Sequence, residues 1–141
     1  MIVGIGTDLC ATRRVEAALT RHGERFARRI LGDHEWPVFL ARREQSAQRG
    51  VRYLASRFAV KEAFSKAIGT GIRHPMTWQA CETVSTDSGK PHLLLGGALQ
   101  PWFDQQGWQA HVSISDDSDH VLAFVVVEHA AAVSLSPLMP E

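Results

Sequence analysis

The sequence predicts a single α+β domain, and its length, its composition and the order of its expected elements all support this. The chain has 141 residues, of which 45% are hydrophobic and 21% are charged, as in ordinary globular domains. The expected order is one strand, three helices, two strands, one helix and two strands. This order does not alternate as a doubly wound parallel sheet requires, so an α+β arrangement fits it better.

The first third of the chain predicts a strand followed by helices. Residues 1–9 alternate apolar and small side chains and indicate a strand that ends at Asp8. Thr12 is suited to cap a helix over 13–30, whose apolar residues recur at helical spacing and which Gly23 can divide in two. A further helix is expected over 33–43.

The rest of the chain contains the strongest helix signal and two expected hairpins. Residues 51–68 contain neither Gly nor Pro, and the glycines at 69 and 71 supply a C-terminal stop. Turn-forming residues then separate the remaining expected elements. These are strands at 80–86 and 91–95, a helix at 98–106, and a last hairpin that pairs 109–115 with 120–128.

Domain limits and cell compartment follow from local composition. We expect one domain over residues 1–129 and a flexible tail over 130–141, which is small, polar and contains proline. The N-terminus has no signal-peptide pattern, and no apolar stretch is long enough for a membrane span. Cys10 and Cys81 are the only cysteines, which suits a reducing cytoplasm.

Positive charge is concentrated in the first half of the chain. Residues 11–57 hold eleven of the fifteen Lys and Arg residues and five of the fifteen acids. Four arginines of the expected helix cluster on one side of it, namely Arg14, Arg21, Arg25 and Arg28. Such a surface suits an anionic partner: nucleic acid, a phosphorylated small molecule or an acidic protein. Charge alone does not choose among them, although no aromatic residues are interleaved for stacking nucleic-acid bases.

The helix expected over 51–68 is apolar nearly all round and yet carries charged residues. Glu62 and Lys66 are four residues apart and therefore share a face, which also contains Ala55 and Ala59. Small neighbours leave room for a ligand to approach these charges, and buried charges need partners. The alternative is an ordinary surface pair of Glu and Lys.

Asp8, at the end of the first expected strand, is placed as a hard oxygen ligand. Mg²⁺ typically takes one or two protein carboxylates and completes its octahedron with phosphate oxygens and water. Asp8, Glu62 and Lys66 would together form a metal–phosphate site. The alternative is that Asp8 only stabilises a turn or caps a helix. Gly4-Ile-Gly6 lacks the third glycine of a dinucleotide-binding loop.

His111 and the Gly89-Lys90-Pro91 turn have weaker signals. His111 starts the run His-Val-Ser-Ile-Ser on an expected strand, where a lone histidine is more often structural than catalytic. Gly89-Lys90-Pro91 reads as a tight turn whose lysine and backbone amides can also meet a phosphate. The histidines show no zinc-ligand spacing.

Taken together, these motifs resemble one known family. The segments are Gly4-Ile-Gly-Thr-Asp8-Leu, Arg57-Phe-Ala-Val-Lys-Glu62-Ala-Phe-Ser-Lys66-Ala, Gly69-Thr-Gly-Ile72, Gly89-Lys-Pro91 and His111-Val-Ser-Ile-Ser115. In this order they resemble bacterial holo-acyl-carrier-protein synthases, the short homotrimeric branch of the 4′-phosphopantetheinyl transferases. The resemblance spans about residues 1–128. It implies that family's fold, in which an antiparallel sheet packs against a long central helix.

The resemblance also implies a reaction and its site. The family transfers 4′-phosphopantetheine from coenzyme A to a serine of apo acyl carrier protein, with release of adenosine 3′,5′-bisphosphate. It implies Asp8 and Glu62 as Mg²⁺ ligands, with Lys66 offsetting phosphate charge. Contacts to coenzyme A are implied for Arg57, Lys66, Gly89, Lys90, Pro91 and His111. Glu62, a water molecule on the metal and His111 all stay open as the base.

Family membership would further imply a homotrimer with sites at subunit interfaces and docking of an acidic carrier protein on the first helix. Arg14, Arg21, Arg25 and Arg28 are the residues expected for that docking surface. Neither nucleic acid nor a membrane is expected as a partner. Two rival functions use the same features: a Mg²⁺-dependent phosphohydrolase at Asp8 and Glu62, and a nucleic-acid-binding module on the arginine-rich helix.

Overall fold

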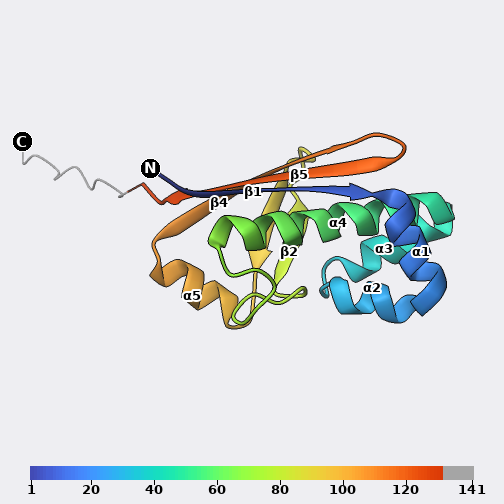
Figure 1. Ribbon diagram of the computed structural model, residues 1–141, viewed down its shortest axis with the longest axis horizontal. Coiled ribbons are helices and arrows are strands. Elements are labelled where there is room, and N and C mark those ends of the chain that lie inside the picture. The colour runs from blue at the N-terminus through green and yellow to red at the C-terminus, as the bar shows by residue number, and fades with distance from the viewer. Residues whose placement is uncertain (132–141) are drawn as a thin grey trace, which may run out of the picture.

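A three-stranded antiparallel sheet and one long helix form the centre of the computed structural model, which describes residues 1–131 (Figure 1). Strand β1 (Ile2–Ala11) pairs with β5 (His120–His129), and β5 pairs with β4 (Trp108–Asp116), in the order β1-β5-β4. Strands β2 (Cys81–Ser85) and β3 (Pro91–Leu95) form a separate antiparallel hairpin. Both predicted hairpins are therefore confirmed, as is the α+β class.

Helix α4 (Ala47–Ile68) lies along one face of the sheet, and most of its residues are buried. It ends as predicted, at Gly69, whose φ of 81° allows the left-handed cap. It begins four residues earlier than the prediction of 51, because the hydroxyl of Ser46 caps it by accepting a hydrogen bond from the Arg49 amide at 3.1 Å. Gly50 lies inside the helix, where its lack of a side chain makes room for Arg43 of the neighbouring helix.

Helices α1 (Thr12–His22), α2 (Glu24–Ile30) and α3 (Trp36–Gln45) gather at one end of α4 (Figure 1). Gly23, with a φ of 67°, divides the predicted 13–30 helix into α1 and α2. The predicted cap at Thr12 is wrong. Ala11 occupies the cap position without a side-chain bond, and the Thr12 hydroxyl donates instead to the Asp119 carbonyl at 3.2 Å.

Helix α5 (Leu99–Gln105) precedes β4 and closes the other end of the core. Its Phe103 packs against Phe64 of α4 and Trp108 of β4, with ring centroids 5.7 and 6.0 Å apart. Within the described residues, no helix combines the length and apolar character needed to cross a membrane. The tail predicted over 130–141 falls almost entirely on residues 132–141, which lie outside the described part of the chain.

The two faces of the sheet differ in what covers them. On β1, Gly4, Gly6, Asp8 and Cys10 face α4, whereas Ile5, Thr7 and Leu9 point to the opposite, uncovered face. The register continues this outer face across Val126, Phe124 and Leu122 of β5. The same strand thus places Asp8 beside the central helix and leaves an apolar row exposed.

Candidate active site

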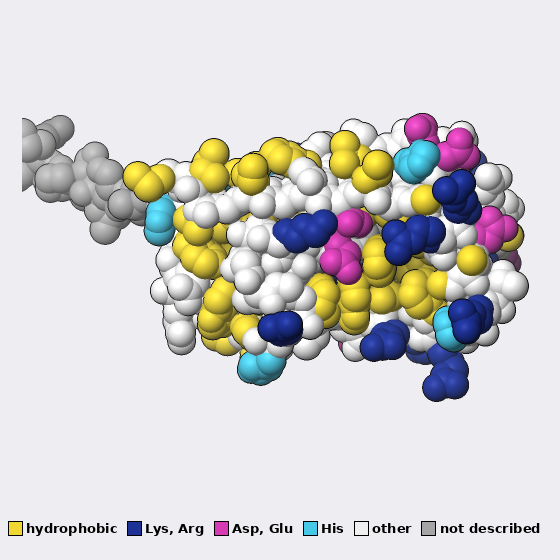
Figure 2. Space-filling model, viewed as in Figure 1, with side chains coloured by type: hydrophobic (Ala, Val, Ile, Leu, Met, Phe, Trp, Pro, Cys, Tyr) yellow, Lys and Arg dark blue, Asp and Glu magenta, His cyan; other side chains and the backbone are white. Residues whose placement is uncertain are grey.

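Asp8, Glu62 and Lys66 meet where β1 crosses α4. The Lys66 ammonium donates to the Thr7 carbonyl at 2.9 Å and lies 3.5 Å from Oδ1 of Asp8. The Lys66 side chain is 53% exposed and the Asp8 side chain 19%, so solvent reaches the group from one side. Figure 2 shows acidic side chains lying between basic ones at this boundary of β1 and α4. The structure therefore brings Asp8 together with two residues that lie more than fifty positions further along the sequence.

The electrostatics of this group favour an added cation. Partial burial raises the pKa of Glu62 above its ordinary value, and the negative charge of Asp8 raises it further, while Lys66 opposes both. Lys66 alone leaves the two carboxylates with an excess negative charge. A divalent cation between the carboxylates would remove that repulsion, and hard oxygen ligands suit Mg²⁺.

The donor set is too small to hold a cation entirely by protein ligands. Among residues 1–131, no three His, Cys, Asp or Glu side chains converge closely enough to hold a metal ion. Two carboxylates without a third protein ligand fit Mg²⁺, which keeps waters and takes the phosphate oxygens of a substrate. This arrangement can position and neutralise a phosphate ester at the mouth of the site.

A second, strongly basic hollow of about 550 Å³ lies at the start of α4. Four arginines line it, and within residues 1–131 none of the four forms an ion pair with a carboxylate. The Arg57 guanidinium lies 4.3 Å from the centre of the Tyr53 ring. The complete lining is Arg42, Arg49, Arg52, Tyr53, Ser56, Arg57, Ser85, Gly89, Pro91, Ile114 and Asp116. Such a cluster of open cations suits a polyphosphorylated ligand.

Three of these arginines, Arg42, Arg49 and Arg52, were missed by the sequence reasoning. Arg49 and Arg52 stand three apart on the first turns of α4, on the same side as Ser56. The helix was expected to start at residue 51, after Gly50, so Arg49 was left outside it. The signal was Ser46, a good capping residue followed by good helix formers on both sides of Gly50.

The predicted coenzyme A contacts are distributed over several places. Arg57, Gly89 and Pro91 line the basic hollow, whereas Lys66 belongs to the carboxylate group. Lys90 is exposed in the turn between β2 and β3, next to Gly89, whose φ of 84° turns the chain there.

His111 lies on the other side of the sheet from Asp8. Its partner across the strands is Val126, which pairs with Ile5 on the outer face, and its ring nitrogen Nε2 is 2.9 Å from the Glu128 carboxylate. Within one protomer the sheet therefore separates His111 from Asp8 and Glu62. The sequence motifs grouped these residues, but a single chain does not bring them together.

The predicted docking arginines divide into two sets. Arg21 and Arg25 line a basic hollow of about 710 Å³ with Ala18, His22, Phe26 and Arg29. Arg28 points elsewhere, because its guanidinium lies 4.0 Å from the centre of the Trp36 ring. Arg14 is exposed on α1, outside that hollow. Arg29, which the sequence reasoning did not choose, takes the place expected for Arg28.

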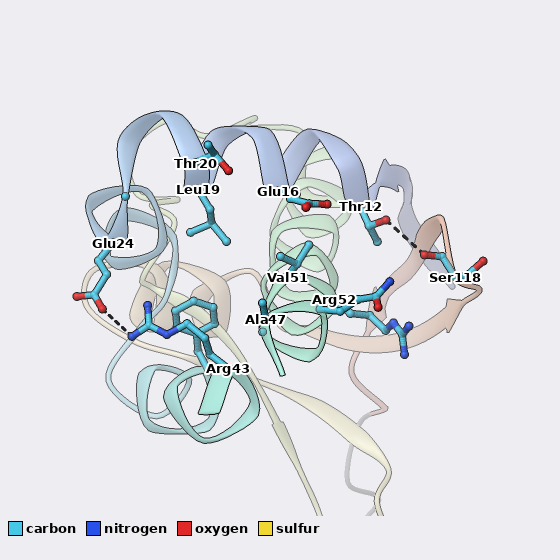
Figure 3. Close-up of a pocket in the computed structure, with 14 residues that line it drawn as sticks. Thr12, Glu16, Leu19, Thr20, Glu24, Arg43, Ala47, Val51, Arg52 and Ser118 are labelled. Atoms are coloured by element: carbon cyan, nitrogen blue, oxygen red, sulfur yellow. Dashed lines mark hydrogen bonds and ion pairs between the residues drawn. The ribbon is translucent and has the colours of Figure 1, made fainter. Parts of the chain in front are cut away.

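A further groove of about 630 Å³ lies between α1, α3 and α4 (Figure 3). Leu19, Phe39 and Val51 contribute its apolar lining, and the Glu24–Arg43 ion pair at 2.6 Å lies at one end. None of the residues predicted for the site lines this groove.

Comparisons with known proteins agree with the motifs. The family model of the 4′-phosphopantetheinyl transferase superfamily matches residues 4–125. Holo-acyl-carrier-protein synthase of Acidovorax sp. (strain JS42) is 53% identical over 128 residues, which cover 91% of this chain and 98% of that protein. The corresponding protein of Bordetella pertussis is 53% identical over 131 residues, covering 93% of this chain and 86% of that one.

Solved structures show the same relationship. Holo-acyl-carrier-protein synthase from Neisseria meningitidis matches with a TM-score of 0.83 and 43% identity, over 91% of this chain and 99% of that one. The Bacillus anthracis enzyme in complex with CoA (3′,5′-ADP) matches with a TM-score of 0.75 and 35% identity, over 92% and 99%. This chain belongs to the 4′-phosphopantetheinyl transferase superfamily.

Proposed function

We propose that the protein transfers 4′-phosphopantetheine from coenzyme A to a serine of an apo acyl carrier protein and releases adenosine 3′,5′-bisphosphate. The observation that carries this proposal is the meeting of Asp8, Glu62 and Lys66 beside β1, in a chain whose relatives are named for this reaction. Two acids and an amine at one opening suit phosphoryl transfer, where charge must be neutralised on transferred and leaving groups.

Asp8 and Glu62 are the residues proposed to hold Mg²⁺. Their two carboxylates fit this ion, which would supply charge stabilisation to the phosphates when it is bound. Lys66 is held beside Asp8 by its bond to the Thr7 carbonyl, which aims its ammonium group at the same opening. In this proposal Lys66 offsets negative charge on the leaving phosphate.

The reaction exchanges one phosphorus–oxygen bond for another. The serine oxygen of the carrier attacks the phosphorus that bears the pantetheine arm, and the bond from that phosphorus to the pyrophosphate bridge breaks. The serine proton passes to a base, and adenosine 3′,5′-bisphosphate leaves with the electron pair of the broken bond. Glu62, a water molecule on the cation and His111 remain the candidates for this base.

The basic hollow is proposed to bind the phosphorylated nucleotide of coenzyme A. Arg57, Gly89 and Pro91, implicated by the sequence, share this hollow with Arg42, Arg49 and Arg52. Coenzyme A carries a pyrophosphate and a 3′-phosphate, so several guanidinium groups without an ion pair among residues 1–131 match its charge. Lys90 in the adjacent turn extends the same positive surface.

The outer face of the sheet supports a homotrimer. Ile5, Leu9, Leu122 and Phe124 on this face are between 40% and 63% exposed, an unusual set for a protein alone in water. Figure 2 shows hydrophobic side chains along the edge formed by the sheet. His111 lies on the same face, so association through it would let His111 serve the site of a neighbouring subunit.

Carrier docking is proposed at the hollow lined by Arg21, Arg25 and Arg29, with Arg14 as an outlying contact on α1. Acyl carrier proteins are acidic, and Phe26 adds an apolar side chain to the lining of this hollow. Charged rims of this kind speed association and select partners more than they add affinity. A reducing cytoplasm stays the expected compartment.

Release of adenosine 3′,5′-bisphosphate tests the reaction against its nearest rival. The protein is incubated with coenzyme A and Mg²⁺, with and without apo acyl carrier protein. We expect the nucleotide to appear only when the carrier is present. Steady release without the carrier would instead show a phosphohydrolase, with water as the nucleophile.

A further inference from the structure

The contact between β1 and α4 is unusually close at two glycines. Gly4 and Gly6 face the helix from the same side of β1 as Asp8, two and one alternate positions before it. A Cβ atom built on Gly6 would overlap the carbonyl oxygen of Ala63 and lie 2.9 Å from the Ala67 amide nitrogen. A Cβ on Gly4 would overlap the carbonyl oxygen of Ala67. The strand and the helix therefore touch backbone to backbone.

This contact lies next to the two carboxylates. Ala63 directly follows Glu62 on α4, Ala67 directly follows Lys66, and Gly6 is two residues before Asp8. The distance between strand and helix at the glycines thus sets how far Asp8 stands from Glu62. Neither side can adjust easily, because α4 is buried and β1 is paired with β5 from Gly4 to Ala11.

We propose that Gly4 and Gly6 are positioning residues that hold Asp8 and Glu62 at the separation required by a small cation, and so select Mg²⁺ over Ca²⁺. The proposal rests on the Mg²⁺ site of the proposed function and assigns a role to residues that touch neither the ion nor the substrates. The glycines act through the spacing of the two elements that bear the ligands.

The magnitudes support this role. A methyl group at Gly6 requires the strand and the helix to move apart locally by roughly 1 Å or more, because the backbone atoms that it would overlap cannot move independently. Mg²⁺ binds oxygen at about 2.0–2.1 Å and demands near-ideal geometry, whereas Ca²⁺ accepts about 2.3–2.6 Å and flexible geometry. A widening of this size exceeds what two Mg²⁺–oxygen bonds tolerate, and it approaches the span that Ca²⁺ accepts.

The test measures cation binding and does not depend on turnover. Dissociation constants for Mg²⁺ and Ca²⁺ are obtained by calorimetry on the full chain with saturating coenzyme A and no carrier, for the wild type, Gly6→Ala and Gly4→Ala. The matched control is Gly96→Ala, because a Cβ there meets nothing within 4 Å and the backbone needs no positive φ. Circular dichroism and thermal melting verify that each variant is folded.

We expect Gly6→Ala to weaken Mg²⁺ binding roughly tenfold, the scale of a lost supporting contact, and Ca²⁺ binding less than about threefold. Gly4 is further from Asp8, near the start of the strand. Gly4→Ala should therefore change the ratio of the Mg²⁺ and Ca²⁺ dissociation constants in the same direction, by about threefold. Gly96→Ala should match the wild type. The proposal would be overturned if folded Gly6→Ala had the same ratio of Mg²⁺ to Ca²⁺ dissociation constants as the wild type. This holds whether both dissociation constants stay the same or rise together.

Other outcomes are equally decisive. If Gly6→Ala does not fold, Gly4→Ala decides by the same ratio. Failure of Gly4→Ala to fold would show that the close contact serves folding and would also overturn the proposal. Asp8→Asn tests the proposed metal site independently of the role of the glycines. If this variant bound Mg²⁺ as tightly as the wild type, the metal site itself would be refuted.

Discussion

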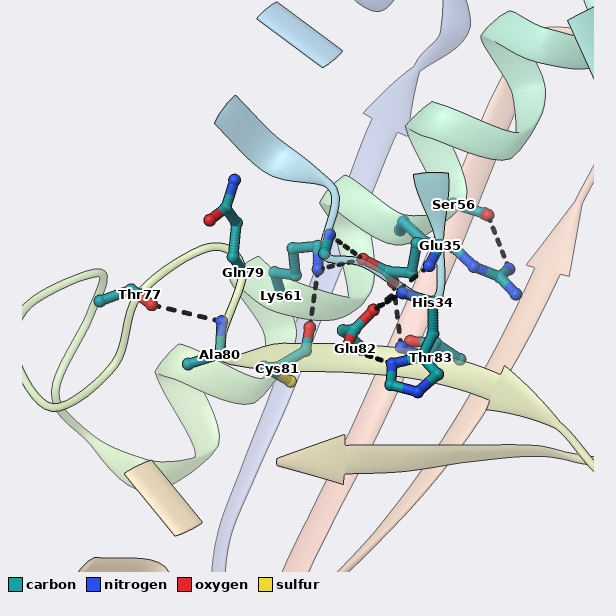
Figure 4. Close-up of polar contacts among 12 residues, drawn as sticks. His34, Glu35, Ser56, Lys61, Thr77, Gln79, Ala80, Cys81, Glu82 and Thr83 are labelled. Atoms are coloured by element: carbon teal, nitrogen blue, oxygen red, sulfur yellow. Dashed lines mark hydrogen bonds and ion pairs between the residues drawn. The ribbon is translucent and has the colours of Figure 1, made fainter. Parts of the chain in front are cut away.

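Two lysines of α4, only five residues apart, have opposite environments. Lys61 is fully buried, and its ammonium donates to Oε1 of Glu35 at 2.7 Å and to the Cys81 carbonyl at 2.7 Å (Figure 4). Lys66 is half exposed and meets only the Thr7 carbonyl and, at 3.5 Å, Asp8. Both belong to the sequence motif that points to the family, yet only one lies at an opening.

The Lys61–Glu35 ion pair is a closed pair, not available to a ligand, because both side chains are buried and hydrogen-bond to other groups of the protein. Glu35 also accepts from the amides of Gly32 and Thr83, at 3.1 and 3.0 Å. Glu82 extends this network by accepting from the His34 amide at 2.7 Å. The cluster ties the α2–α3 connection to α4 and β2 (Figure 4). Asp8, Glu62 and Lys66 instead have bonding capacity left over, which is what a binding site requires.

Loss of Glu62 should have the largest effect on the reaction. Glu62→Gln removes one proposed cation ligand and should slow transfer about a thousandfold, as expected when several kcal/mol of charge stabilisation are lost. The melting temperature of this variant should not fall, because the substitution removes a negative charge that partial burial and Asp8 disfavour. Single-turnover transfer to the carrier measures the rate. Full activity in folded Glu62→Gln would place the cation site elsewhere.

Loss of Lys61 should instead act on stability. Lys61→Met leaves the Glu35 carboxylate buried without its partner and should lower the free energy of unfolding by about 3–5 kcal/mol. The double variant Lys61→Met/Glu35→Gln should recover part of this. Glu24→Gln breaks the exposed Glu24–Arg43 pair and is the control, with an expected loss of about 1 kcal/mol or less. Urea unfolding measures all three. A Lys61→Met protein as stable as the control would contradict the closed-pair interpretation.

The same contrast extends to the arginines of α2. Arg25 lines the open basic hollow, whereas Arg28 stacks on Trp36. Arg25→Glu should raise KM for the carrier roughly tenfold, and Arg28→Glu should raise it less than about threefold. Coenzyme A affinity should stay the same in both. Equal increases for the two variants would remove the distinction between an open and a partnered arginine.

The smallest expected effect is a pH dependence that comes from Glu62. Its pKa is raised in the folded protein, by burial first and then by Asp8, so the folded state holds this proton more tightly than the unfolded chain. Below about pH 4, where both states are protonated, Glu62 has no net effect. As pH rises, Glu62 ionises first in the unfolded chain, which lowers the free energy of unfolding. This destabilisation grows with pH and reaches its full size once the raised pKa of the folded state is passed.

Melting of metal-free protein measures this effect. Glu62→Gln should match the wild type in acid and melt progressively higher than the wild type as pH rises toward neutral. With coenzyme A present throughout, added Mg²⁺ should raise the melting temperature of the wild type at neutral pH and raise that of the variant much less. A difference in melting temperature between Glu62→Gln and the wild type that is largest in acid would contradict this prediction.

Sequence reasoning found the open site because its residues follow simple rules. The spacing of Glu62 and Lys66 placed them on one helical face, and the alternation of the first expected strand pointed to Asp8. The strand does not end there as predicted, because β1 continues to Ala11. The closed pair was not found, because nothing local joins Glu35 to Lys61 across twenty-six positions. Only the folded position of the α2–α3 connection brings them together.

His111 and the arginines of the basic hollow show two other limits. The motif placed His111 near the site, but strand parity depends on register, which the sequence alone does not determine, and the structure puts it on the outer face. Gly50 concealed the first turn of α4 and with it Arg49. A glycine is tolerated inside that helix because Arg43 packs against it, which is a tertiary contact.

The mass of the carrier protein tests the central claim most directly. Apo acyl carrier protein is mixed with coenzyme A, Mg²⁺ and the full chain, and its intact mass is measured. The account predicts a gain of one 4′-phosphopantetheine group on each carrier, and no gain when Mg²⁺ is removed by a chelator. An unchanged carrier mass with folded protein and Mg²⁺ present, or the same gain after Mg²⁺ removal, would contradict it.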